Sequence, residues 1–106
     1  MLSPRLFCLA TALAVLPATA GLAEPSAARQ DELLYRLRQD CGSCHGLTLK
    51  GGLGPALLPQ AIAGKSSEAL SDIILYGVPG TPMPPWAFEI DRDEVDWLVR
   101  RLKEGL

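Results

Sequence analysis

The pentapeptide Cys41-Gly42-Ser43-Cys44-His45 constrains the fold of this chain more than any other feature, and it holds the only histidine. Two cysteines separated by two residues and followed by histidine form the attachment signature of a c-type haem. In that chemistry the two thiols add to the two vinyl groups on one side of the porphyrin. The adjacent histidine then lies under the iron and supplies a nitrogen ligand. The sequence therefore predicts one covalently bound haem c, held by Cys41 and Cys44 with His45 as an axial ligand.

Three other chemistries compete for the same residues. A thioredoxin-like dithiol requires a preceding strand and a following helix, whereas here a helical pattern precedes and a glycine-rich segment follows. A closed zinc site requires four ligands, and beyond the N-terminal segment the chain offers only Cys41, Cys44 and His45. A structural disulfide would leave His45 without a role. A disulfide, a dithiol and another metal remain as alternatives to haem.

The N-terminus has the pattern of a secretory signal peptide over residues 1–23. Arg5 supplies the positive charge, residues 6–16 form an apolar run, and small residues allow cleavage after Ala20 or Ala23. The apolar run is too short for a membrane span. An uncleaved N-terminal anchor is the alternative interpretation.

Cleavage would leave residues 24–106 as a single monohaem cytochrome domain, and Cys8 would leave with the signal. Outside the cytoplasm free thiol pairs tend to become disulfides, so Cys41 and Cys44 need a role that survives oxidation. The full chain has 10 basic and 12 acidic residues and a net charge of −2. This balance argues against nucleic-acid binding, and we expect no stable membrane association after cleavage.

Hydrophobic periodicity predicts an all-α domain of three main helices joined by long loops rich in glycine and proline. The first helix is expected over residues 27–40, with Gly42 and Gly46 breaking it around the cysteines. The second is expected from Ser66 or Ser67 to Gly77, and the last from Asp91, where Asp91 and Glu94 form a capping box. The expected buried positions are Leu33, Leu34 and Leu37; Leu70, Ile73, Ile74 and Gly77; and Val95, Leu98, Val99 and Leu102. Loops this long in a small domain suggest that they wrap a ligand.

Met83 is the predicted second axial ligand, because beyond the signal segment it is the only remaining methionine and His45 is the only histidine. Prolines at 82, 84 and 85 restrict the backbone around its thioether. A core-filling methionine and an open or lysine-ligated iron are the alternatives. Ligation by His45 and Met83 fills both axial positions, which favours outer-sphere electron transfer over catalysis on a bound substrate. The protein is accordingly not expected to be an enzyme.

Gly54-Pro55 follows the histidine closely, and the carbonyl of Pro55 is predicted to accept a hydrogen bond from the Nδ1–H of His45. An ordinary turn is the alternative. The sequence does not assign roles to Trp86, Tyr76 or Lys50.

The segments "CGSCHG", "GPAL" and "MPPW", between a first and a last helix, resemble the class I c-type cytochromes. The wider stretches "RQDCGSCHGLTLKGGLGPALLP" and "GVPGTPMPPW" are similar to the cytochrome c-55X family of denitrifying bacteria. The resemblance implies a periplasmic monomer that serves the cytochrome cd nitrite reductase, by electron delivery or in maturation of its haem d1. It also implies covalent haem at Cys41 and Cys44, axial ligation by His45 and Met83, and support of His45 by Pro55. Class I cytochromes commonly place a glycine where the first and last helices cross, and here Leu33 stands near that place.

A ligand-binding haem sensor and a non-haem dithiol protein are further rivals. The sensor requires a vacant iron position, and the dithiol protein requires that no haem is attached.

Overall fold

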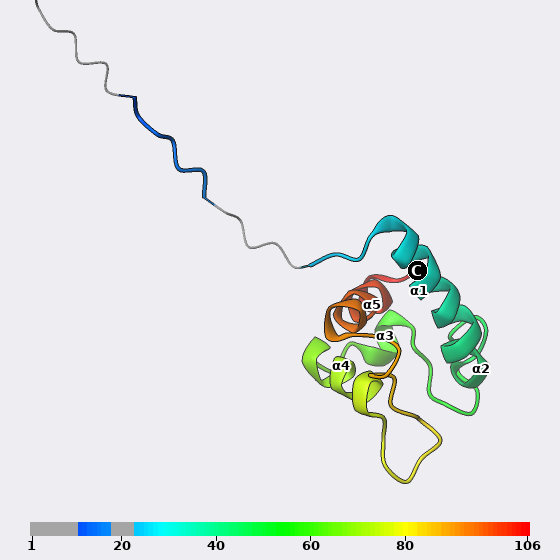
Figure 1. The fold of residues 1–106 in the computed structure, drawn as a ribbon. Coiled ribbons are helices and arrows are strands. Elements are labelled where there is room, and N and C mark those ends of the chain that lie inside the picture. The colour runs from blue at the N-terminus through cyan, green and yellow to red at the C-terminus, as the bar shows by residue number, and fades with distance from the viewer. Residues whose placement is uncertain (1–10, 18–22) are drawn as a thin grey trace, which may run out of the picture.

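The computed structural model describes residues 11–17 and 23–106 (Figure 1). Residues 11–17 are exposed and have no regular secondary structure. Most of the predicted signal peptide, with Arg5, Cys8 and the cleavage point after Ala20, lies outside the described residues, so that prediction stays a prediction. Within the described ranges no helix is both long and apolar enough to cross a membrane.

The domain is built from helices, and the described residues contain no strand. This confirms the all-α prediction. The element order is α1 (Ala27–Arg36), the π-helix η1 (Leu37–Cys41), α2 (Gly42–His45), α3 (Pro59–Ile62), α4 (Ser67–Tyr76) and α5 (Arg92–Glu104). In Figure 1, α2 and the loop between α4 and α5 lie at the same end of the domain.

The expectation that the first helix ends before the cysteines is wrong. Gly42 adopts right-handed helical angles (φ −63°, ψ −26°), so α1, η1 and α2 form one continuous helical rod over residues 27–45. The rod ends only at Gly46, whose φ of +92° leaves the helical region. Glycine lowers helix propensity but permits helical angles, and here the flanking turns hold Gly42 in them. Cys41, Cys44 and His45 therefore project from a helix rather than from a loop.

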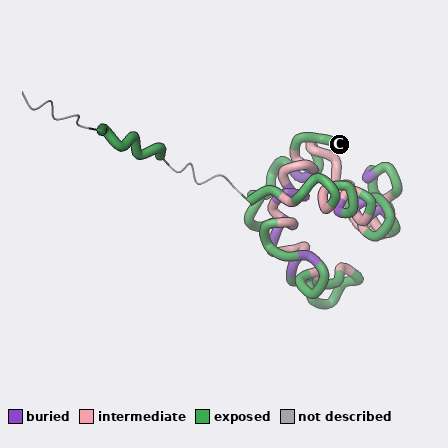
Figure 2. Tube along the Cα trace, turned by 45° about the horizontal axis from the view of Figure 1, so that its top comes forward, coloured by how far each residue is buried: buried purple, intermediate pink, exposed green. Residues whose placement is uncertain are grey.

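The core forms where α1 and α4 pack against α5. Leu33 of α1 and Val95 and Val99 of α5 are completely buried, and Figure 2 shows the buried positions of the domain in purple. The two helices thus pack together with Leu33, and no glycine, on the α1 side of the core. The predicted α5 positions are all buried, and the remaining core side chains are Leu37, Leu49, Ile62, Leu75, Ile90, Trp97, Leu98 and Leu102.

The predicted inner face of α4 is displaced by one position. Ser71 and Leu75 are buried, whereas Leu70 and Ile74 are only partly buried against the core. The Ser71 hydroxyl donates a hydrogen bond to a carboxylate oxygen of Asp96 on α5, at 2.6 Å. A completely buried serine therefore lies on the side of α4 that contacts α5, which hydrophobic periodicity alone cannot predict.

The residues that cap the N-terminal ends of α4 and α5 were predicted correctly. The side chain of Ser66 accepts a hydrogen bond from the Ala69 amide and begins α4, and Asp91 and Glu94 form a complete capping box at the start of α5. Glu94 also binds Arg29 of α1, with Nε–Oε1 at 2.7 Å and Nη2–Oε2 at 3.0 Å. One carboxylate thus caps α5 and joins it to α1.

The substitution Glu94→Gln should show how much the charge of this carboxylate contributes to the free energy of unfolding. Arg29 first, and then the Asp91 amide, lower the pKa of Glu94 below its ordinary value, so the stabilisation is present above the unfolded pKa of about 4.3. It is lost as pH falls through the lower folded pKa. Because glutamine retains the capping bond, we expect a loss of about 1 kcal/mol at pH 7 that shrinks below about pH 4. Thermal unfolding across pH measures it.

Glu104→Gln is the matched control, because within the described residues no ion pair is recorded for Glu104 on the same helix. A loss in Glu94→Gln that is independent of pH would contradict the assigned role of the charge.

Candidate functional site

The two cysteines project from the helical rod one turn apart. Cys41 ends η1 and Cys44 lies in α2, and residues at i and i+3 of a helix share a face. Both side chains are free thiols and are partly buried. A π-helical segment inserts an extra residue into a helical turn and often occurs at functional sites. Here it lies immediately before the cysteine pair and sets the direction in which the pair points.

Burial, followed by the charge of Asp40, raises the pKa of the Cys41 thiol to about 11. At neutral pH this side chain is therefore a neutral thiol that packs against the hydrophobic core. In the described part of the chain, no three His, Cys, Asp or Glu side chains converge as a metal site. Cys41, Cys44 and His45 are instead spread along the rod.

The His45 ring has a fixed orientation. Its Nδ1 lies 2.6 Å from the carbonyl oxygen of Pro55. Because a carbonyl can only accept, Nδ1 carries the proton and donates, which leaves the lone pair of the neutral ring on Nε2. A histidine with Nδ1 held by a carbonyl has the tautomer required for metal ligation through Nε2.

Gly54 lies against the face of the same ring. A Cβ built at Gly54 would meet Cε1 of His45 at 2.7 Å and Nδ1 at 2.8 Å, which is closer than carbon atoms pack. The Gly54 amide donates to the Cys44 carbonyl at 2.9 Å, and the Gly51 amide donates to the His45 carbonyl at 2.8 Å. The glycine-rich loop thus closes the end of α2 and fits around the imidazole.

The loop between α4 and α5 carries Met83 and is called the Met83 loop. It is attached to the C-terminal end of α4. The Trp86 amide donates to the carbonyls of Ile74 and Leu75, at 3.0 and 3.1 Å, and the Ala87 amide also reaches Leu75, at 3.1 Å. Helix-terminal carbonyls lack partners within the helix, so the loop supplies them. The loop therefore begins and ends on the last turn of α4.

Gly77 lets the loop fold back on that helix. Its φ is +70°, and a Cβ there would meet the Met83 carbonyl oxygen at 2.8 Å. The Val78 amide donates to the same oxygen at 3.2 Å. A residue with a side chain would be strained in this conformation and would also push the loop away.

Thr81 is a site residue that sequence reasoning missed. Its hydroxyl donates to the Val78 carbonyl at 2.7 Å and accepts from the Met83 amide at 3.3 Å. A threonine two residues before a predicted ligand could have suggested this turn, since Ser and Thr hydroxyls commonly bond nearby backbone groups. The Met83 side chain is partly buried.

The sequence assigned no role to Trp86, Tyr76 or Lys50, and the structure places them in different surroundings. Trp86 is partly buried and stacks on Phe88, with ring centroids 6.3 Å apart. Tyr76 and Lys50 are exposed. Trp97 of α5 is buried in the core, with the Arg101 guanidinium 5.5 Å from its ring centroid.

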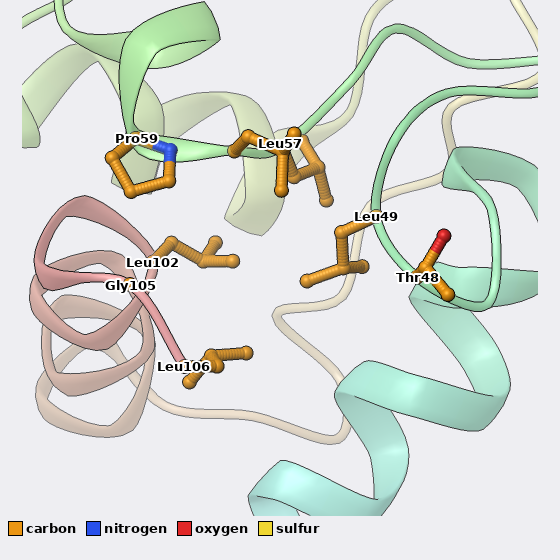
Figure 3. Close-up of a pocket in the computed structure, with 8 residues that line it drawn as sticks. Thr48, Leu49, Leu57, Pro59, Leu102, Gly105 and Leu106 are labelled. Carbon is orange, nitrogen blue, oxygen red and sulfur yellow. The ribbon is translucent and has the colours of Figure 1, made fainter.

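A separate apolar hollow of about 230 Å³ lies at the C-terminal end of α5 (Figure 3). Figure 3 shows Leu49, Leu102 and Leu106 directed toward a shared space, with Thr48 at its edge. Cys41, His45 and Met83 do not line it; its lining is Thr48, Leu49, Leu57, Leu58, Pro59, Leu102, Gly105 and Leu106. It marks the contact between the loop that follows His45 and the end of α5.

The donor set fits a covalently bound haem. Two thiols lie one turn apart, the imidazole presents Nε2, and a thioether stands on a separately anchored loop. A porphyrin requires this arrangement, with attachment along one edge and ligands from two segments. A closed tetrahedral site would require convergence on one point.

Comparisons with known proteins agree with this chemistry. Residues 27–100 match the family model described as cytochrome C oxidase, cbb3-type, subunit III. The chain is 58% identical over 87 residues to a cytochrome c55X of Pseudomonas aeruginosa, covering 80% of this chain and 73% of the relative. It is 51% identical over 91 residues to the cytochrome c55X of Paracoccus denitrificans, covering 86% of this chain and 88% of the relative.

Three further similarities concern two solved structures and one larger protein. The structure of the c-type cytochrome NirC has a TM-score of 0.75 at 58% identity, covering 76% of this chain and 95% of that one. A structure titled dihydro-heme d1 dehydrogenase NirN in complex with DHE has a TM-score of 0.62 at 37% identity, covering 71% of this chain but only 16% of that one. A dihydro-heme d1 dehydrogenase of Pseudomonas aeruginosa is 39% identical over 74 residues, covering 70% of this chain and 15% of the relative.

The substitution Gly54→Ala should disturb the His45 ring. The added methyl group overlaps the ring, which the Pro55 carbonyl prevents from moving freely, so we expect a loss of about 1–3 kcal/mol together with a lower yield of haem-loaded protein. Thermal unfolding and the haem absorption per chain measure the two effects. Gly64→Ala is the matched control, because a Cβ at Gly64 meets nothing within 4 Å. Equal behaviour of the two variants would contradict the packing of Gly54 on His45.

Proposed function

The chain belongs to the cytochrome c55X family of c-type cytochromes, and from this membership we propose that it is a periplasmic carrier passing single electrons to the cytochrome cd nitrite reductase. The observation that carries the proposal is the donor set on the helical rod and the Met83 loop. Cys41 and Cys44 would attach the haem, and His45 and Met83 would supply its axial ligands.

The cofactor of this family is covalently bound haem c, which supplies a one-electron redox couple. The protein's own groups adjust it. The Pro55 carbonyl fixes the Nδ1 proton of His45 and strengthens Nε2 as a donor. A thioether ligand raises the reduction potential. Rigid attachment of the Met83 backbone to α4 limits the reorganisation that a change of charge would otherwise require.

Ligation of the iron by both His45 and Met83 is also the reason that we propose an electron carrier rather than an enzyme or a sensor. If His45 and Met83 both bound the iron, no coordination position would stay open to a small molecule. Electrons would then cross at the edge of the cofactor, near Cys41, Cys44 and the Met83 loop. Redox encounters of this kind are small and short-lived, which suits a monomeric carrier.

The periplasmic location rests on residues 1–23 acting as a signal peptide that is removed after Ala20 or Ala23. Residues 24–106 would then form the mature domain. This division is supported by the position of α1, because within residues 11–17 and 23–106 the first regular secondary structure begins at Ala27.

Maturation of haem d1 is a second candidate function. It is favoured by the similarity to a domain-sized part of proteins titled dihydro-heme d1 dehydrogenase. In this role the chain would exchange electrons with the assembly machinery of the reductase rather than with the finished enzyme.

The substitution Met83→Ala tests the axial assignment. The variant should retain the mass increase of one covalent haem, because Cys41 and Cys44 are unchanged, but it should lose the weak red absorption band typical of methionine ligation in the oxidised form. The reduced variant should bind carbon monoxide, whereas the wild type should not. A wild type that binds carbon monoxide would favour the sensor, and a wild type without covalent haem would favour the dithiol protein.

Electron delivery can be tested by mixing reduced protein with purified cytochrome cd nitrite reductase and following oxidation. Residues 41–64 and 73–88 contain a single charged side chain, Lys50. Since electrostatically steered association falls steeply with salt, we expect the rate here to change less than about threefold from low to high ionic strength. Lys50→Gln should change the rate little, and Lys65→Gln, just outside these segments, is the matched control.

The same experiment separates the two candidate functions. A carrier is oxidised by the finished reductase at a rate that keeps pace with turnover. Absence of transfer, together with a reductase that lacks haem d1 in a strain deleted for this protein, would replace the carrier proposal with the maturation role.

A further inference from the structure

Glu89 joins the two segments that carry the predicted axial ligands. Its carboxylate forms an ion pair with Arg36 of the helical rod, with Oε2 and Nη1 2.5 Å apart, and its backbone carbonyl accepts from Nη2 of Arg29 at 3.3 Å. We call these two contacts the Glu89 bridge. Among the hydrogen bonds and ion pairs found in the described residues, they alone connect residues 27–45 with residues 77–90.

On the helical rod, the Glu89 bridge ends on Arg29 and Arg36, and both arginines also form ion pairs with other carboxylates. Glu32 lies between them, 2.7 Å from Nη1 of Arg29 and 3.6 Å from Nε of Arg36. Glu94 of α5 binds Arg29 from the other side. The arginines therefore do not need to be ordered anew to reach Glu89, which reduces the entropic cost that makes isolated surface pairs weak.

On the loop, Glu89 connects to Met83 through a short and well-bonded path. The Glu89 amide donates to the Trp86 carbonyl at 3.0 Å, and the Trp86 amide is fixed to the end of α4. Ile90, the next residue, is buried in the core. A displacement of Glu89 would therefore be transmitted to Trp86, which follows Met83 by three residues.

We propose that the Glu89 bridge is a positioning element that holds the Met83 loop at a fixed separation from the rod that carries His45. The inference rests on the proposed axial role of Met83. Loss of the bridge raises the fraction of molecules in which the thioether has left its ligating position, while the helices stay folded. Arg36 and Glu89 are thus positioning residues that act through the backbone, and neither is a ligand.

The experiment uses the oxidised holoprotein and imidazole as the probe. Imidazole can replace Met83 only in molecules whose loop has opened, so its apparent dissociation constant falls as the open fraction rises. Glu89→Gln keeps the side-chain size and removes the ion pair with Arg36. Arg36→Gln shortens the side chain and removes the contacts of Arg36 with both Glu89 and Glu32. Each should tighten imidazole binding about twofold to fivefold, in line with the measured range for ion pairs of this kind.

A second readout separates positioning from general stability. During thermal unfolding, the red methionine band of the two variants should disappear at a lower temperature than in the wild type, by more than the helical circular dichroism shifts. Asp72→Asn is the matched control, because it removes the ion pair between Asp72 and Arg92, also 2.5 Å long, which joins α4 to α5. It should leave imidazole affinity unchanged.

The double variant Arg36→Gln with Glu89→Gln should resemble either single variant, since contacting residues are not additive. The inference is overturned if all variants, Asp72→Asn included, shift affinity and unfolding together, or if the double variant is the sum of the singles. A wild type that lacks the red band overturns the axial role of Met83 itself. The failure of the proposed function is thereby distinguished from the failure of the bridge.

Discussion

The packing of α1 against α5 is the constraint on which the site depends. Leu33, Val95 and Val99 are completely buried at this contact, and Arg29 and Glu94 join the same helices at its edge. Because α1 continues without interruption to His45, the crossing fixes the direction of the imidazole. Because α5 also packs on α4, it fixes the helix end to which the Met83 loop is attached. One interface thereby orients both predicted ligands.

The two segments that carry the predicted axial ligands are held by different means. His45 stands at the end of a helix and is surrounded by backbone, with Gly54 against the ring face and the Pro55 carbonyl on Nδ1. Met83 stands on a loop whose amides complete the open carbonyls of α4. His45 is thus part of a helix, whereas the Met83 backbone is held by hydrogen bonds within its loop, and the loop is held by hydrogen bonds to the end of α4. Any ligand exchange is therefore expected on the methionine side.

Local chemistry made most of the fold predictable from the sequence. The capping box at Asp91, the serine cap at Ser66 and the α5 stripe depend on residues close together in the chain, and the structure has them as expected. The missed features depend on distant residues. The burial of Ser71 involves a hydrogen bond to Asp96 on another helix, and the helical geometry of Gly42 involves the turns on either side. The donor set itself could be proposed from the sequence, but its support by Thr81 and Glu89 required the fold.

Most residues that form ion pairs lie outside the two segments proposed to contact a partner protein. Ion pairs recorded in the described residues fall on residues 24–36, 72 and 89–100, whereas residues 41–64 and 73–88 carry one charged side chain. Charges close to the cofactor would shift its potential and would attract partners of opposite sign indiscriminately. Most of the ion-paired residues lie on α1, α4 and α5, where they join the helices to one another and to the end of the Met83 loop, and Asp40 is the charged residue next to Cys41 at the proposed contact surface. Recognition of a partner by this domain would then depend on shape and apolar contact, which act only at close range.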